Sequence, residues 1–453
     1  MQTRTLMSGL LVAAGLIAAA ADVSAQTSLT IYNDGRILAR RTLPVTVPQG
    51  TSQHRLALGT LEPGTVFTLD QAITILGSQF DAAVDDQNTM RRAVGRRILF
   101  RHPTSGDTTR VTVLGVDPER FQFPDGSVGF ARPGQPLYPA DLVLIDPTLT
   151  LSIRSSAARS SLGLGWFTGG GGWQAHYAVT LDGASARVAG HAAINAGPLS
   201  LDSVEVQVLA GSVGRASQPM MRQLASRGEV MAMAAEMDVA QSEQVGEAYL
   251  YTIPGRLTLR PGVVTTVALF EPATAPVERN YVVHSGLPFR GAIGQYGDMG
   301  ETPVAVSYTL KRPVRTPFGD LAVPGGVVRL YQRDEAGRAQ LIGEGAVRHT
   351  APGQDLRVDA GSAFDLTARR VQTTYTTRRD SLRTIMLADY EVTIANAKDS
   401  TVTVDVLEER AGEWRVIQSS VTAERISSTR TRFRVRVPPQ GQVVVTYRIE
   451  ARW

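Results

Sequence analysis

Four aromatic residues are the strongest candidates for a binding site in this 453-residue chain: Trp173, Tyr177, Tyr390 and Trp414. Exposed on a strand, such rings form a platform on which sugar rings or a peptide can stack. Buried, the same rings anchor the cores of two β-sandwiches. Trp173, Ala175 and Tyr177 share one face of a strand by period two, which favours burial of that strip.

The sequence shows no catalytic or metal-binding motif. Neither His-x-His nor His-x-x-x-His spacing occurs among the six histidines, which are His54, His102, His176, His191, His284 and His349. The absence of cysteine excludes a thiol nucleophile, disulfides and cysteine-ligated metals. There is no Gly-x-Ser-x-Gly motif, and the glycines at 169–172 lack the Lys-Ser or Lys-Thr of a phosphate-binding loop. We therefore assign no catalytic, cofactor-binding or metal-ligating residue and expect no cofactor.

The charge pattern indicates a solvated surface rather than a nucleic-acid interface. The chain has 46 basic and 42 acidic residues, a net charge of +4, and only Lys311 and Lys398 are lysines. Like charges never follow one another five in a row. A nucleic-acid footprint needs a continuous basic stripe with interleaved aromatic residues, so we expect no nucleic-acid partner.

The first 25 residues have the pattern of an export signal. Arg4 is followed by an apolar, alanine-rich run from Leu6 to Ala21, and Val23-Ser24-Ala25 supplies small residues at the cleavage site. The run is shorter than the roughly 20 residues of a membrane-spanning helix. We expect a signal peptide at 1–25, cleavage after Ala25, and a periplasmic or cell-surface protein that is not integral to the membrane.

Alternating apolar residues and turn signals predict an all-β protein of several units. Residues 26–84 read as an N-terminal β unit with a hairpin turn at Asn33-Asp34-Gly35. Residues 85–147 read as a weak helix at Asp85–Val94 followed by short strands, which predict a small SH3-like barrel. In this prediction the run Leu142–Ile145 closes the barrel.

The remaining chain reads as two β-sandwiches. Residues 148–284 form the first, interrupted by a methionine-rich insertion at 213–246 that carries no histidine and so does not resemble a metal site. Residues 285–453 form an immunoglobulin-like sandwich, with strands expected at 304–310, 327–332, 390–394, 402–407, 433–437 and 443–449.

The order of four motifs resembles the mucoidy-inhibitor-like group of exported bacterial proteins, whose C-terminal region is a conserved domain of unknown function. The motifs are Leu29–Gly35; Trp173–Tyr177 with Ile194–Gly197 and Leu209–Gly211; Leu321–Tyr331 with Ala363–Asp365; and Tyr390–Lys398 with Trp414. The resemblance implies an all-β architecture, an envelope location and no assigned catalytic residue. The chain departs from many members in lacking a long coiled-coil insertion.

These observations favour a non-catalytic binding or scaffold module of the cell envelope, with an envelope glycan or protein as partner and its oligomeric state open. One alternative is an envelope polysaccharide-active enzyme with two facing carboxylates roughly 5–10 Å apart on a sandwich face. The other is an outer-membrane β-barrel, because residues 443–453 alternate toward a terminal tryptophan.

Overall fold

The computed structural model describes residues 27–82, 84–211, 214, 240–284, 295–380 and 383–452. Nearly all of the regular structure in these residues is β-strand, which confirms the all-β prediction, and one helix is present among them. No helix in these ranges is long and apolar enough to cross a bilayer. The predicted signal peptide at 1–25 lies outside the described residues, as does the predicted insertion at 213–246 except for Gly214 and 240–246.

The described residues form two compact units. The first holds 27–29 and 38–169, and the second holds 30–37 and 170–452. The hairpin of β1 (Thr27–Tyr32) and β2 (Arg36–Leu43) has its outer part, 30–37, in the second unit, with the expected turn at Asn33-Asp34-Gly35 between its strands. The predicted boundaries at 84/85, 147/148 and 284/285 fall inside these units and stay predictions.

One part of the first unit is a three-stranded antiparallel sheet in the order β3-β11-β5, formed by Gly50–Ala57, Thr148–Ser155 and Ile73–Asp81. The central strand β11 buries Leu149, Leu151 and Ile153 in strict alternation, because successive side chains point to opposite faces of a sheet. In the same unit β12 (Leu162–Gly169) pairs with the short β4 (Phe67–Thr68).

The other part of the first unit is a helix with a five-stranded antiparallel sheet. Helix α1 spans Asp86–Arg92, within the predicted helix, and Asp85 caps it. The sheet has the order β10-β6-β7-β8-β9, formed by Gln135–Leu137, Arg97–Arg101, Thr108–Val116, Glu119–Gln122 and Val128–Gly129. The prediction that Leu142–Ile145 closes this sheet is wrong: β10 pairs with β6, and Leu142 packs into the core from a turn.

The second unit is built on one long path of paired strands, β22-β21-β13-β14-β19-β20-β23-β24-β29-β26. In that order their bounds are Ala339–Val347, Gly326–Arg333, Gly172–Asp182, Ser185–Asn195, Val264–His284, Asp298–Leu310, Leu356–Asp380, Arg383–Asn396, Gly441–Arg452 and Glu413–Ser419. Off this path lie β25 (Val402–Glu409), β27 (Ala423–Ser427) and β28 (Arg430–Val437). Strands β15 to β18 span Leu201–Ala210, Gln241–Val245, Ala248–Thr252 and Leu257–Leu259. All six strands expected at 304–449 are present.

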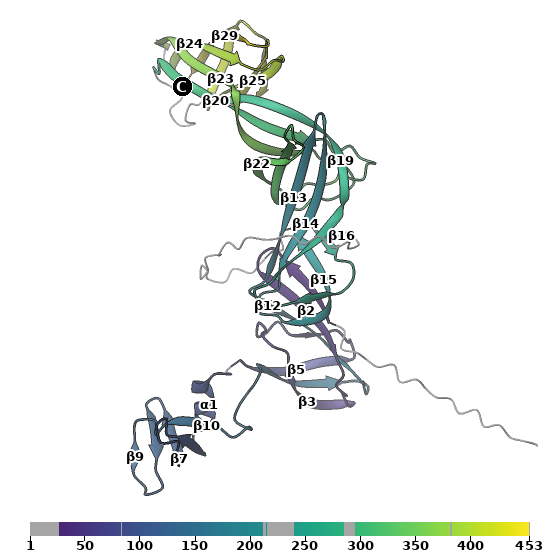
Figure 1. The fold of residues 1–453 in the computed structure, drawn as a ribbon, viewed down its shortest axis with the longest axis vertical. Coiled ribbons are helices and arrows are strands. Elements are labelled where there is room, and N and C mark those ends of the chain that lie inside the picture. The colour runs from purple at the N-terminus through teal and green to yellow at the C-terminus, as the bar shows by residue number, and fades with distance from the viewer. Residues whose placement is uncertain are drawn as a thin grey trace, which may run out of the picture. The chain divides into compact units, whose positions relative to one another are not determined.

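Strand β19 changes hydrogen-bonding partner part-way along its 21 residues (Figure 1). From Val264 to Pro276 it pairs with β14, and from Val277 to Val282 it pairs with β20. Its last four residues also pair in parallel with residues 404–407 of β25. Pro276 has no N–H to donate to a ladder, so a change of partner next to it costs no hydrogen bond there.

Strand β21 meets β13 in parallel with very little space between the two backbones. Gly326 is the direct partner of Ala175, and a Cβ at position 326 would collide with the carbonyl oxygen of Ala175. The glycine at 326 is therefore required by close backbone approach, while its φ angle is not in the positive range that also favours glycine.

We predict that Gly326→Ala destabilises the chain by about 1–3 kcal/mol, because the added methyl must push two paired strands apart. A strand glycine without such a neighbour normally gains stability on the same change. Gly77→Ala in β5 is the matched control, since nothing lies within 4 Å of a Cβ there. Denaturant unfolding of the three proteins checks this, and equal midpoints for both variants would contradict it.

Candidate functional site

The four aromatic residues singled out from the sequence are core residues. Trp173, Tyr177, Tyr390 and Trp414 are 8%, 3%, 1% and 3% exposed. A platform needs exposed rings, so these rings do not form one, and they have the burial expected of core anchors. Each polar end has a buried partner: Trp173 Nε1 donates to the carbonyl of Leu209, and Tyr177 Oη donates to that of Pro324.

Tyr390 and Trp414 belong to a buried ionic cluster around Glu408 on β25. The carboxylate of Glu408 contacts Arg370 Nη2 at 2.7 Å and Arg410 Nε at 2.8 Å, and all three residues are at most 2% exposed. Tyr447 Oη donates to Glu408 Oε2 at 2.8 Å, and Arg410 Nη2 donates to Tyr390 Oη at 2.7 Å. Burial raises the pKa of Tyr447, which keeps this hydroxyl protonated as a donor.

This cluster is enclosed in the core, and its carboxylate is not accessible to a substrate. Glu408 is occupied by two guanidinium groups and one phenol, and the guanidinium of Arg370 also lies 4.4 Å from the ring centre of Tyr390. A carboxylate so enclosed has no face left for an external substrate. Trp414 completes the enclosure, because its Nε1 donates to the carbonyl of Arg410.

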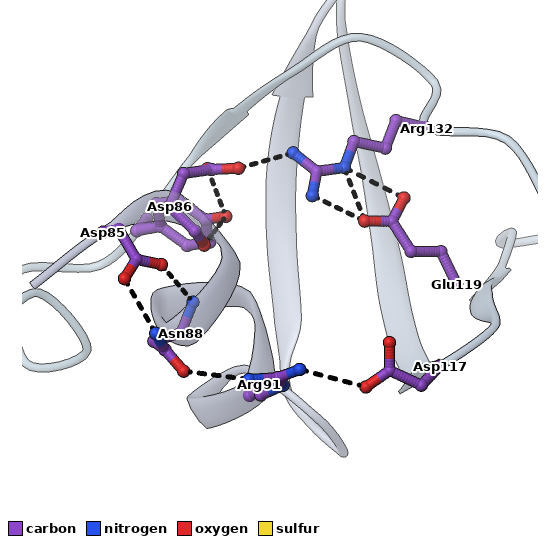
Figure 2. A network of polar contacts seen from close by, with 8 residues as sticks. Asp85, Asp86, Asn88, Arg91, Asp117, Glu119 and Arg132 are labelled. Carbon is purple, nitrogen blue, oxygen red and sulfur yellow. Dashed lines mark hydrogen bonds and ion pairs between the residues drawn. The ribbon is translucent and has the colours of Figure 1, made fainter. Parts of the chain in front are cut away.

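A second concentration of carboxylates surrounds α1 in the first unit, and its members are also paired (Figure 2). Arg132 Nε lies 2.9 Å from both carboxylate oxygens of Glu119, and its Nη1 donates to Asp86 at 2.6 Å. Asp85 caps the helix through Asn88, and Asp117 accepts from Arg91.

The pKa values of Arg132 and Asp86 reflect these hydrogen bonds. The pKa of Arg132 is raised chiefly by its hydrogen bond to Glu119. Burial of Asp86 opposes ionisation, but hydrogen bonds from Arg132 and Tyr138 hold the pKa of Asp86 below its usual value. Asp86 therefore stays ionised and paired with Arg132 near neutral pH, and this pairing links α1 to the five-stranded sheet.

Two of the six histidines are brought together by the fold. His176 on β13 lies directly opposite His191 on β14. Burial lowers the pKa of both side chains, and for His176 the nearby Arg329 adds to the effect. Within the described ranges, no group of three or more His, Asp or Glu side chains is arranged to hold a metal ion.

The candidate site is a groove of about 480 Å³ beside the partner change of β19. Gly183, Val277, Arg279, Tyr281, Tyr308 and the consecutive residues Ser400–Thr403 line it. The turn between β13 and β14 supplies Gly183, and β19 and β20 supply Val277, the arginine and the tyrosines. Ser400 and Thr401 come from the turn before β25, and Val402 and Thr403 are the first two residues of that strand.

Arg279 is held over an aromatic ring in this groove. Its guanidinium carbon lies 5.4 Å from the ring centre of Tyr308, its direct cross-strand neighbour on β20. Its Nη1 lies 3.5 Å from Tyr281 Oη. The ring of Tyr308 is buried, whereas Arg279 is exposed, so the tyrosine forms the floor and the guanidinium faces the solvent-filled space.

The wall formed by Ser400–Thr403 is positioned by a buried amide. Asn396 Nδ2 donates to the carbonyls of Ser400 and Pro438 at 2.9 Å each, and Asn396 Oδ1 accepts from the N–H of Lys398. Lys398 in turn forms an ion pair with Asp365 at 2.9 Å. The side chain of Asn396 thus fixes the turn that delivers the hydroxyl residues to the groove.

Sequence analysis missed this groove, because its residues come from four separate stretches and none belongs to a known motif. Two signals in the sequence point toward it. Asp182-Gly183 is a hairpin-turn dipeptide, and Pro272 and Pro276 interrupt an otherwise strand-like run.

Phe364, which belongs to one of the motifs that carry the family resemblance, is 97% exposed and lies next to Asp365.

Comparisons with protein-family models, with curated proteins and with solved structures found no match to this chain.

We predict that Glu408→Gln destabilises the fold by about 3–5 kcal/mol, because it leaves Arg370 and Arg410 buried without their counter-charge. Asp405→Asn on the same strand is the matched control. Asp405 pairs with Arg432 and Arg434 at the surface, where such pairs contribute about 0–1 kcal/mol. Thermal and denaturant unfolding measure the stability of both variants. Similar losses of unfolding free energy would contradict the prediction that the buried cluster contributes more than the surface pair.

We also predict that stability falls as pH drops below about 6.5, in part through the histidine pair. Because the folded-state pKa values of His176 and His191 are lowered, the unfolded chain binds protons more tightly in that window. Unfolding midpoints of the wild type and of the double variant His176→Gln, His191→Gln, measured from pH 7.5 to 5, should show a flatter profile for the variant. If the unfolding midpoint depends on pH equally in the wild type and the double variant, the histidine pair does not contribute to the loss of stability.

Proposed function

We propose that this chain is an exported, non-catalytic binding protein of the bacterial cell envelope, and that the groove at Arg279 holds an envelope glycan. One observation carries the proposal: the groove combines a guanidinium, two tyrosines and a row of hydroxyl residues, and its lining contains no aspartate or glutamate. Hydroxyl, phenol and guanidinium groups offer hydrogen bonds to sugar hydroxyls, and aromatic rings contact the apolar faces of sugar rings.

The same lining favours binding over hydrolysis. Glycoside hydrolysis ordinarily uses two carboxyl groups on either side of the scissile bond. The groove supplies neither, and the carboxylates around Glu408 and around α1 are occupied by arginines. A glycan held here meets donors and acceptors that position it, with no acid and base to cleave it.

The envelope location is supported by the N-terminal sequence and by composition. The apolar run before Ala25 has the features of a cleaved export signal, and a chain without cysteine needs no oxidative folding after export. The resemblance to mucoidy-inhibitor-like proteins points to the same compartment.

We predict that Thr401→Trp abolishes glycan binding while leaving the fold intact, because an indole on this exposed residue fills the groove. The chain from Gln26 onward is screened on a glycan array, and the ligands found are then titrated by calorimetry against both proteins. Mass spectrometry of the ligand after incubation checks that it is not cleaved.

Thr377→Trp is the control for this experiment, since Thr377 is an exposed threonine far along β23 from the groove. It should bind as the wild type does. If the Thr401 variant binds as well as the wild type, the glycan does not bind in this groove. Cleavage of the glycan would favour the enzyme alternative. Capture of an envelope protein instead of a glycan would show that the ligand is a protein.

A further inference from the structure

The positive charge in the groove has no acidic partner. No carboxylate lies within ion-pair distance of Arg279 in the part of the chain that the structure describes, and its near neighbours are the phenol side chains of Tyr281 and Tyr308. Although burial opposes the charged form, the tyrosine hydroxyls hold the pKa of Arg279 above its usual value. The groove therefore presents a permanent, oriented cation to whatever enters it.

A second arginine lies at the edge of the same groove. Arg436 on β28 is the direct antiparallel partner of Thr403, so the two side chains share a face with Cβ atoms about 5 Å apart. Arg434, two residues earlier on that face, is neutralised by Asp405 at 3.2 Å. Arg436 forms no such pair with any described residue, and it is exposed.

The remaining lining sets what kind of anion fits. Val277 and the ring of Tyr308 give an apolar floor, and the hydroxyl groups of Tyr281, Ser400, Thr401 and Thr403 surround it. A ligand that matches all three features has an acidic group, several hydroxyls and an apolar ring face. A simple inorganic anion would leave the hydroxyls and the floor unused.

We propose that the ligand is an acidic glycan whose sugar carboxylate pairs with Arg279, and that a neighbouring acidic sugar of the same chain is held by Arg436. This inference rests on the proposed function and narrows it to a charge class. A guanidinium matches the two oxygens of a carboxylate in a planar, bidentate pair. Strands and a turn line the groove, so it lacks the helix N-terminus that often binds a phosphate group.

The test uses the chain from Gln26 onward and oligomers of galacturonic acid as the probe. We expect these oligomers to bind and carboxyl-reduced oligomers of the same length not to bind. Arg279→Gln should weaken binding by about tenfold or more, since it removes a charge-assisted hydrogen-bonded pair. Arg436→Gln at the edge should weaken it by roughly three- to fivefold, and added salt should reduce the difference.

Arg379→Gln controls for the overall loss of positive charge. Arg379 is exposed and pairs with Thr384, twelve residues along β24 from Asn396, which is about 40 Å at 3.3 Å per residue. This variant should bind as the wild type does. Equal weakening by Arg379→Gln would mean unspecific charge attraction and would overturn the proposal.

Two further outcomes separate this inference from the proposed function. Neutral glycans that bind as well as acidic ones, with binding lost in Thr401→Trp but kept in Arg279→Gln, would overturn the acidic class and leave the groove as a glycan site. Polyphosphate that binds in the groove more tightly than the uronate oligomer would overturn the carboxylate assignment. Absence of any glycan in the groove would overturn both proposals.

Discussion

The change of partner along β19 is the constraint on which the candidate site depends. A strand that hydrogen-bonds to β14 up to Pro276 and to β20 from Val277 must turn from one set of neighbours to another over one peptide. Proline suits that point because it has no N–H to leave unsatisfied. The residues just past it, Val277, Arg279 and Tyr281, line the space that opens there. The groove is thus a direct result of how the backbone hydrogen bonds are distributed.

The buried cluster at Glu408 secures the other wall of that groove. Strand β25 follows Ser400 and Thr401 directly and carries Thr403 near its start, and Glu408 lies near its far end. Two arginines and Tyr447 hold the glutamate in the core, so the strand that carries Thr403 is fixed at both ends, by Asn396 before it and by Glu408 within it. Charges that are costly to bury are kept here in mutual contact, and the result is a well-positioned strand.

Much of the fold could be predicted from the sequence, because strands with one buried face alternate between apolar and polar residues. That pattern located strands such as β20, β25 and β29. It failed for β23, whose 25 residues are rich in arginine and threonine, because these residues hide the alternation: Arg370 is buried against Glu408, while its neighbour Arg369 is exposed and pairs with Asp298 across the sheet. The groove could not be predicted, since its lining depends on a change of strand partner that leaves no periodic trace. Trp173 and Tyr177 could be recognised as candidates from the sequence, but their burial depends on contacts with β17 and with the 321–324 segment, which are far away in the chain.

Hydrogen–deuterium exchange of the chain from Gln26 onward, with and without a saturating uronate oligomer, tests the central claim most directly. If the partner change of β19 builds the binding site, protection should appear in segments around 277–281, 306–309 and 400–404 and not in the five-stranded sheet of the first unit. Protection confined to other segments, or none at a ligand concentration where calorimetry shows saturation, would contradict the account.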